Sequence, residues 1–181
     1  MPVENEDLKK IVLEYLRRHN TMTLATVHNN IPWAATVFYA EDGFTFYFIS
    51  NPNVCLHCLN IAHNPRVAIT IDEDYALRSQ NDWRRVKGVQ MEGTAELVAD
   101  WEEINQAVTA YAVKYPWTST YLKSVFSSRR VTSLLSKAAA KLKFVSDFTA
   151  SMDNRFYKVT PTKVWFVDNE TSFEKRQEVP F

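Results

Sequence analysis

The chain carries the sequence Ile49-Ser-Asn-Pro-Asn-Val-Cys-Leu-His-Cys-Leu-Asn-Ile-Ala-His-Asn-Pro-Arg-Val-Ala-Ile-Thr-Ile71 where its pattern is most informative. An aromatic strand over 44–49 leads into a polar turn. A short helix is expected over 54–63, and an Asn-Pro pair ends it because the residue before proline disfavours the helical conformation. Residues 66–72 then alternate as a new strand. Since Ser50 places a hydroxyl between a strand and a helix start, this segment is typical of a site for an anionic group.

The residues before this stretch change from a helical to a strand-like hydrophobic period. Residues 6–19 place apolar side chains at helical spacing, with acidic residues in the first turn, where the helix dipole favours them. Residues 21–28 and 31–40 alternate as strands, and the turns Asn29-Asn30 and Glu41-Asp42-Gly43 connect them to their neighbours. Three strands joined by hairpins predict an antiparallel sheet.

The residues after it add further strands and helices. Residues 83–98 are expected to form a strand with natural bulge positions at Gly88 and Gly93. A helix is expected to begin at Asp100, with Glu103 completing a capping box, and a helical insertion is expected over 118–150, with a helix over 133–144. Two late strands, over 155–160 and 163–168, are expected on either side of Pro161, followed by an irregular tail over 169–181. Strands and helices that are segregated favour a mainly β (α+β) barrel over a layered βαβ fold.

Composition narrows the class of protein. A chain of 181 residues is expected to form one domain with one substantial core. The formal net charge of +0 gives no reason to expect nucleic-acid binding. Only 3 glycines are present and no glycine-rich phosphate motif occurs. No apolar run approaches the about 20 residues that cross a bilayer, and no secretion signal is evident at the N-terminus, so a cytoplasmic location is expected.

Six segments carry a resemblance to a known family. They are Met22-Thr-Leu-Ala-Thr-Val27, Pro32-Trp-Ala-Ala-Thr-Val-Phe38, Phe46-Tyr-Phe-Ile-Ser50, Asn60-Ile-Ala-His-Asn-Pro-Arg-Val-Ala68, Val89-Gln-Met-Glu-Gly-Thr-Ala-Glu-Leu97 and Phe156-Tyr-Lys-Val-Thr-Pro-Thr-Lys-Val-Trp-Phe166. In their order and spacing, the chain resembles the pyridoxamine 5'-phosphate oxidase-like, FMN-binding split-barrel family. The resemblance implies a Greek-key-like antiparallel split barrel that forms a homodimer and binds FMN at the subunit interface.

The resemblance also implies roles for particular residues. The isoalloxazine would lie beside Ala35, Thr36 and Val37 of the second strand. The ribityl chain and phosphate would be reached by the end of the third strand, at Phe48, Ile49 and Ser50, with His57 beyond them. The ring edge would be hydrogen-bonded by Gln90, and the ring would be covered by Trp165 or Phe166 of the neighbouring subunit.

Two departures from the family pattern are visible. His57 stands where the family usually has a phosphate-binding Lys or Arg, and the charge of a histidine depends on pH near neutrality. Arg84, Arg85 or Lys87 are candidates to compensate. The chain ends in Lys175-Arg-Gln-Glu-Val-Pro-Phe181 and lacks the Arg-Leu-x-Pro-like ending that holds substrate in true pyridoxamine 5'-phosphate oxidases. We therefore expect a relative of those enzymes with another substrate.

Two further patterns allow more than one interpretation. Cys55-Leu-His-Cys58 can be a redox pair or half of a zinc site, but no second ligand pair follows, so no metal site is expected and two packed thiols are favoured. The stretch from Ile104 to Ser146 has several Lys and Arg and no Asp or Glu. It is interpreted as a solvated helix face, with an anion-attracting lid as the functional alternative.

The resemblance implies an FMN-dependent oxidoreductase that passes hydride or electrons from NAD(P)H to a small acceptor, because the cofactor itself performs the electron transfer. Three alternatives stay open. The chain can be a non-catalytic flavin carrier or sensor, a haem-binding split barrel that uses His57 or His63, or a deazaflavin-dependent reductase.

Overall fold

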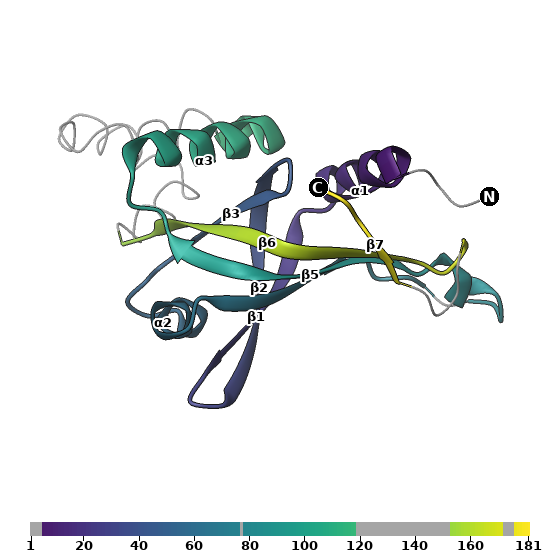
Figure 1. The fold of residues 1–181 in the computed structure, drawn as a ribbon, viewed down its shortest axis with the longest axis horizontal. Coiled ribbons are helices and arrows are strands. Elements are labelled where there is room, and N and C mark those ends of the chain that lie inside the picture. The colour runs from purple at the N-terminus through teal and green to yellow at the C-terminus, as the bar shows by residue number, and fades with distance from the viewer. Residues whose placement is uncertain (1–4, 77, 119–152, 172–175) are drawn as a thin grey trace.

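The strands form a closed ring (Figure 1). The computed structural model describes residues 5–76, 78–118, 153–171 and 176–181. Within these ranges seven strands form one antiparallel sheet in the order β3-β2-β1-β4-β5-β6-β7, and β3 also pairs with β6. The strands are β1 (Thr21–His28), β2 (Ile31–Asp42), β3 (Thr45–Ser50), β4 (Arg66–Asp72), β5 (Lys87–Leu97), β6 (Arg155–Asp168) and β7 (Arg176–Glu178). The run β4-β1-β2-β3 is the Greek-key order, so the expected Greek-key-like α+β barrel is confirmed.

Within the described ranges, three helices pack against the ring of strands. They are α1 (Asn5–Arg18), α2 (Leu56–His63) and α3 (Trp101–Lys114), with short 3-10 turns η1 (Asp82–Arg85) and η2 (Pro116–Thr118). Figure 1 shows α1 and α3 above the strands and α2 below them. The buried residues of α1 and α2 belong to the same apolar cluster as the inward side chains of the strands. A second cluster lies beneath α3, against outward residues of β2, β3 and β6.

The hairpin turns follow directly from their residue types. Asn29 and Asn30 have φ values of 51° and 62°, and Gly43 has a φ of 61°. Asparagine and glycine tolerate this left-handed region, and two successive positive φ values give a turn whose twist matches that of the flanking strands. This chemistry fixes the register of β1 on β2, in which Thr23 pairs with Thr36 and Ala25 with Ala34.

The prediction of two separate late strands around Pro161 was wrong, since β6 is continuous. Glu92 pairs with Lys163 and Gly93 with Pro161, so Thr162 is the extra residue of a β-bulge. A Cβ atom on Gly93 would lie 2.4 Å from the Thr160 carbonyl oxygen, so only glycine allows this close approach. The bulge accommodates a proline that cannot donate to the ladder, and it also reverses which residues face inward.

The start of β5 and the structure of the tail also differ from the sequence predictions. Strand β5 begins at Lys87, because the residues before it form η1. The tail was expected to be irregular, but β7 pairs Trp165 with Glu178 across the edge of β6. The helix predicted over 133–144 and most of the insertion predicted over 118–150 lie outside the described residues.

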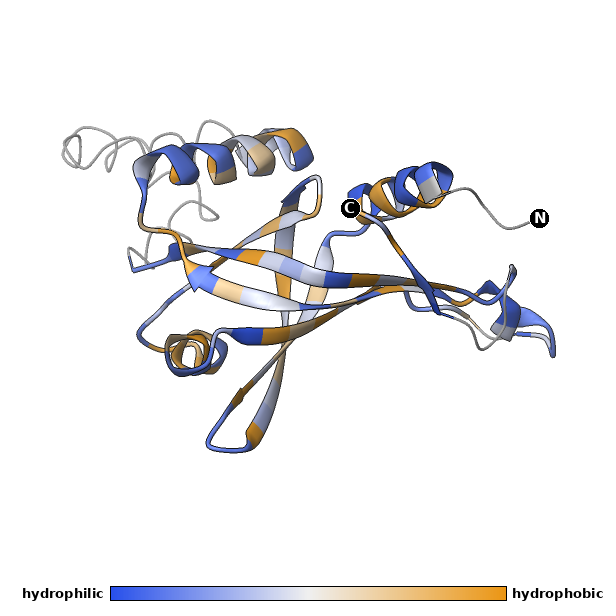
Figure 2. Ribbon diagram, in the orientation of Figure 1, coloured by the Kyte–Doolittle hydropathy of each residue, from blue (hydrophilic) through white to orange (hydrophobic). Residues whose placement is uncertain are grey.

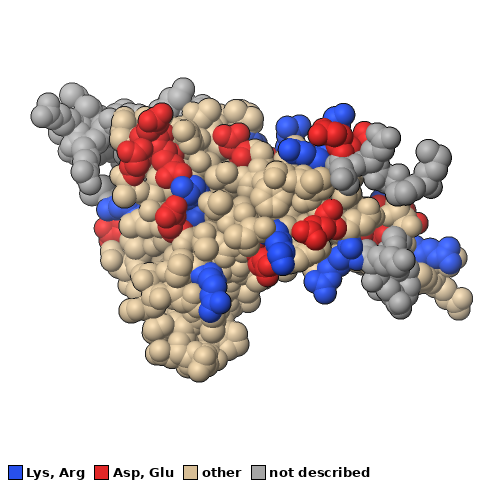
Figure 3. Space-filling view, in the orientation of Figure 1, with Lys and Arg blue, Asp and Glu red and all other residues tan. Residues whose placement is uncertain are grey.

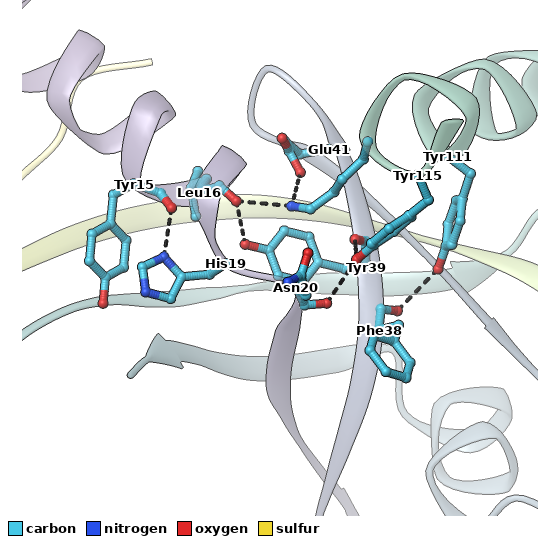
Figure 4. A network of polar contacts seen from close by, with 10 residues as sticks. Tyr15, Leu16, His19, Asn20, Phe38, Tyr39, Glu41, Tyr111 and Tyr115 are labelled. Carbon is cyan, nitrogen blue, oxygen red and sulfur yellow. Dashed lines mark hydrogen bonds and ion pairs between the residues drawn. The ribbon is translucent and has the colours of Figure 1, made fainter. Parts of the chain in front are cut away.

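A polar network joins α1, β2 and α3 (Figure 4). The Tyr39 hydroxyl donates to the Leu16 carbonyl oxygen at 2.7 Å, and Lys114 Nζ donates to the same oxygen at 2.9 Å. Lys114 Nζ also lies 2.5 Å from Glu41 Oε2 and 3.8 Å from the centre of the Tyr39 ring. The Tyr115 hydroxyl donates to the Tyr39 carbonyl oxygen at 2.9 Å. These bonds satisfy the C-terminal end of α1 and hold α3 against the barrel.

Candidate functional site

The first eight residues of β2 are poorly covered, since Ala35 and Val37 are partly buried and the other six are exposed. None of these eight is classed as buried, although a strand normally buries at least one face. The large side chains Ile31, Trp33 and Phe38 are 69%, 45% and 64% exposed. Residues 21–40 contain no Asp, Glu, Lys or Arg, and the end of the molecule formed by the β1–β2 hairpin is uncharged in Figure 3. An apolar surface of this kind marks an interaction site.

Figure 2 also shows hydrophobic residues along the hairpin, which projects below the barrel. Part of this hairpin is held by α2. Asn60 Nδ2 donates to Thr26 Oγ1 at 3.0 Å, and the ring of His63 stacks on that of His28 with centroids 4.3 Å apart. Side chains of α2 therefore hold β1 close to the turn of the hairpin, while most of β2 stays exposed or only partly buried.

Small side chains form a flat surface on the outer face of the barrel. The pairing registers place them in two rows that run across β2, β1 and β4. We call this surface the platform, and its six residues are Thr36, Thr23 and Thr70 in one row and Ala34, Ala25 and Ala68 in the next. All six are partly or fully exposed, and none carries a charge.

Larger side chains border the platform on β5 and β6. Thr70 pairs with Gln90, and Gln90 pairs with Trp165. The side chains of Gln90 and Trp165 therefore extend the threonine row across β5 and β6. Gln90 Oε1 accepts from Arg176 Nη1 at 3.2 Å. Three inter-strand steps separate Thr36 from Gln90, or about 14 Å at about 4.8 Å a step. The surface is therefore long and shallow enough for a planar multi-ring ligand, with a hydrogen-bonding amide at one end.

The residues predicted to contact the cofactor lie on three different surfaces. Thr36, Gln90 and Trp165 face outward at the platform. Ala35 and Val37 lie on the opposite face of β2, where they pair with Leu24 and Met22. Consecutive side chains of a strand point to opposite faces of the sheet. The sequence alone therefore did not show which of the three residues on β2 faces outward, since this depends on the strand register.

The third-strand candidates are buried to different degrees. Phe48 is 0% exposed and stacks on Tyr157 with ring centroids 5.0 Å apart, so its side chain belongs to the core. Ile49 packs against the cluster beneath α3. Of the two aromatic candidates on β6, Phe166 is buried and only Trp165 is at the outer face.

Ser50 and His57, both candidates for the phosphate end, lie next to each other in the structure. Ser50 Oγ lies 2.7 Å from His57 Nε2, and both side chains are buried. Burial lowers the pKa of His57, so the ring is neutral at neutral pH. The two side chains are hydrogen-bonded to each other. The positive charge expected on His57 therefore requires more acidic conditions than for an ordinary histidine.

The cations proposed to compensate lie at the η1 end of the sheet. Lys87 Nζ is 2.6 Å from Glu170 Oε2 and 3.4 Å from Asp168 Oδ2, so its charge is already matched. Arg84 lies over the Trp83 ring at 5.3 Å. Sequence reasoning missed Arg66, which shares the outward parity of Ala68 and Thr70 on β4 and is exposed. Its guanidinium has no ion pair with any described residue, and its alternation with Val67 was the signal that could have found it.

Among the described residues, no group of three or more His, Cys, Asp or Glu side chains is arranged to hold a metal ion. None of the described helices combines the length and apolar character needed to cross a membrane.

The chain was compared with known proteins at the level of structure. A haem-binding protein from Mycobacterium smegmatis aligns with a TM-score of 0.62 at 19% identity, over 98% of this chain and 58% of that chain. A conserved hypothetical protein from Mycobacterium tuberculosis aligns at 0.61 with 15% identity, over 100% and 94% of the two chains. An FAD-binding protein from Mesorhizobium loti aligns at 0.56 with 19% identity, over 87% and 90%. At these identities the likeness shows the fold.

Comparison with curated protein sequences gave no match. The family model described as pyridoxamine 5'-phosphate oxidase matches residues 8–168, which include most of α1, the whole of α2 and α3, and strands β1 to β6. The resemblance inferred from the sequence is therefore confirmed, and the chain belongs to the pyridoxamine 5'-phosphate oxidase family of split barrels.

Proposed function

We propose that the protein is a homodimeric flavoprotein that binds FMN on the platform and passes hydride or electrons from NAD(P)H to a small acceptor. The observation that carries the proposal is the platform itself, a flat outer surface of Ala and Thr bordered by Gln90 and Trp165. The flavin, when bound, supplies the redox chemistry, while the protein binds and orients it.

The residues present fit a flavin. Ala25 and Ala68 leave room for a planar ring to lie against the sheet, and the threonine row offers hydroxyl groups along its edge. The side-chain oxygen of Gln90 is already bonded to Arg176, so the amide nitrogen is the group available to a ring oxygen or nitrogen. Hydrogen bonds of this type tune flavin electronics.

The exposed part of β2 supports the proposed homodimer. Phe38 exposes apolar surface on the platform face of β2, whereas Ile31 and Trp33 expose it on the opposite face, and this segment has no charge that would oppose self-association. In the proposed dimer a second copy covers this strand and encloses the outer face of the ring. Trp165 lies at the border of the platform and is the aromatic residue proposed to contact the flavin.

The phosphate end is proposed to lie toward Arg66. It is on the outer face of β4, one outward position beyond Ala68, and it presents a guanidinium without an ion-pair partner among the described residues. Guanidinium groups suit phosphate because their parallel N–H groups match its oxygen atoms. Ser50 and His57 remain proposed phosphate-end donors, although the bond between them must open for either to reach a ligand.

The domain and its location are also proposals. We propose that residues 1–181 form a single FMN-binding split-barrel domain with a helical insertion at about 118–150, and that the protein acts in the cytoplasm.

A haem-binding function is the second candidate. Two structural neighbours are named for haem, the Mycobacterium smegmatis protein and the haem storage protein HutZ from Vibrio cholerae, which aligns with a TM-score of 0.58 at 14% identity. In this chain His57 is engaged by Ser50, whereas His63 is exposed and stacked on His28. His63 is therefore the better candidate for an iron ligand. A flavin carrier and a deazaflavin reductase use the same surface and differ in turnover and in cofactor.

Absorption spectroscopy separates these functions. Purified protein is titrated with FMN, with the deazaflavin or with haem, and NAD(P)H is then added to the flavin complex. Quenched FMN fluorescence followed by bleaching on NAD(P)H addition is expected; bound flavin that stays oxidised supports a carrier, and a Soret band alone supports haem.

Two variants locate the site. Ala68→Phe fills the platform and is expected to abolish FMN binding, while Ala99→Phe, at an exposed position between β5 and α3, is expected to leave it unchanged. Equal FMN affinity in both variants would contradict the assignment of the platform.

A further inference from the structure

Cys55 and Cys58 are placed where a disulfide can form without backbone movement. Cys55 is the N-cap of α2, and its carbonyl oxygen accepts from the amides of Cys58 at 2.9 Å and Leu59 at 3.1 Å. A turn closed in this way holds the Cα atoms of residues i and i+3 within about 7 Å. Disulfides span Cα separations of about 4.4–6.8 Å. Their backbone geometry is therefore that of a C-x-x-C pair on the first turn of a helix.

The two thiols differ in exposure and already interact. Cys58 is 1% exposed, whereas Cys55 is only partly buried. The side chains of Tyr157, Cys55 and Ser50 are near enough to the Cys58 thiol to influence its pKa. Such asymmetry suits a dithiol in which the accessible sulfur meets a reactant and the enclosed sulfur completes the reaction.

A proton acceptor for the enclosed thiol lies next to it. Burial raises the pKa of Cys58 to about 11, so the thiol needs a base to react. Ser50 interacts with Cys58 and lies 2.7 Å from His57 Nε2. Because the His57 ring is neutral, one of its nitrogens can accept a proton, and Ser50 connects that ring to the thiol.

We propose that Cys55 and Cys58 form a redox-active dithiol whose substrates are low-molecular-weight disulfides. Cys55 gives its proton to solvent and its sulfur attacks one sulfur of the small disulfide, whose S–S bond breaks; the departing sulfur takes up a proton from solvent and leaves as one thiol, and a mixed disulfide remains on Cys55. Cys58 then attacks Cys55 Sγ and releases the second thiol, while its proton passes through Ser50 and His57 to the departing sulfur. Two protein thiols are oxidised to one disulfide and one small disulfide is reduced to two thiols. The reaction needs no flavin and is independent of the platform.

The test uses the reduced full-length protein with excess bis(2-hydroxyethyl) disulfide, followed by acid quench, alkylation and mass spectrometry. The wild type is expected to end with an intramolecular disulfide, seen as the loss of two hydrogen atoms and of both alkylation sites. Cys58→Ser is expected to stop at a mixed disulfide on Cys55, and Cys55→Ser to keep its buried thiol unmodified over the same time. A wild type that stops at the mixed disulfide, or stays fully reduced, would overturn the proposal.

The proton path has its own readout. Ser50→Ala is expected to slow the second step at least tenfold, so that the mixed disulfide accumulates, while the first step keeps its rate and Ser50→Thr restores the second. Equal slowing of both steps would overturn the role of Ser50. Should a cysteine variant fail to fold, equilibration of the wild type with mixtures of reduced and oxidised dithiothreitol decides the main point. Two thiols that remain alkylatable at the oxidising end contradict it.

Discussion

Removal of the Lys114 ammonium is expected to destabilise the barrel strongly. Lys114 and Glu41 side chains are only 5% and 8% exposed, and their charged atoms lie 2.5 Å apart. In Lys114→Met the carboxylate of Glu41 stays buried without its cation, and breaking one side of a buried pair costs about 3–5 kcal/mol. The Leu16 carbonyl oxygen keeps its bond from Tyr39, so little is added from that group.

The assay is urea unfolding at neutral pH, followed by circular dichroism. Lys163→Met is the matched control, because Lys163 and Glu92 lie 3.6 Å apart at 54% and 51% side-chain exposure, and such exposed pairs contribute about 0–1 kcal/mol. The double variant Lys114→Met with Glu41→Leu removes both charges and is expected to regain most of the lost free energy of unfolding. A single variant no less stable than the control would refute the reasoning.

The pH dependence has a definite sign. Burial raises the pKa of Glu41 above its ordinary 4.5 even beside Lys114, and the loss of Lys114 removes the interactions that hold it down. A carboxyl with a raised folded-state pKa is most favourable below its unfolded pKa and loses that stability as the pH rises. The deficit of Lys114→Met relative to wild type is therefore expected to be largest at neutral pH and to shrink toward pH 4.5. A deficit that grows on acidification would contradict this account.

Three further predictions concern separate parts of the molecule. Gly93→Ala is expected to lose about 1–3 kcal/mol in thermal unfolding, because its Cβ would meet backbone at 2.4 Å, whereas Gly88→Ala, with its nearest atom at 3.4 Å, should change little. Ile31→Glu is expected to convert a wild-type dimer into a folded monomer in analytical ultracentrifugation, and a monomeric wild type would refute the proposed interface. Asp100→Ala removes the carboxylate that accepts from the Glu103 amide at 3.0 Å; about 0.5–2 kcal/mol of stability should be lost, and an unchanged unfolding midpoint would show that the cap contributes nothing.

Local sequence patterns predicted most of the elements. The bounds of β1 and β4 were predicted correctly because their alternation is strict and both ends are marked by turn residues. Strand β6 was read as two strands because the inward phase changes at Thr162, and the cause of that change is Gly93 on the neighbouring strand. Nothing within residues 155–168 reveals that partner.

The site was harder to predict for the same reason. Thr36 and Gln90 were proposed from their positions in the family resemblance, whereas the alanines of the platform become one surface only when β1 pairs with both β2 and β4. Residue type alone does not distinguish Ala25 from any other small strand residue. Burial of His57 against Ser50 likewise depends on how α2 packs, which the spacing of seven residues does not determine.

Closure of the ring by β3 and β6 has a consequence for synthesis of the chain. Ser50 pairs with Arg155, so one edge of β3 must wait until most of the polypeptide has left the ribosome. Until then β3 exposes an unpaired row of amides and carbonyls that can join the strand of another nascent chain. Native pairing at such sequence separation also makes folding slow relative to helical proteins of similar size. Cells that express this protein at high temperature or high rate should therefore depend on chaperones that shield that edge.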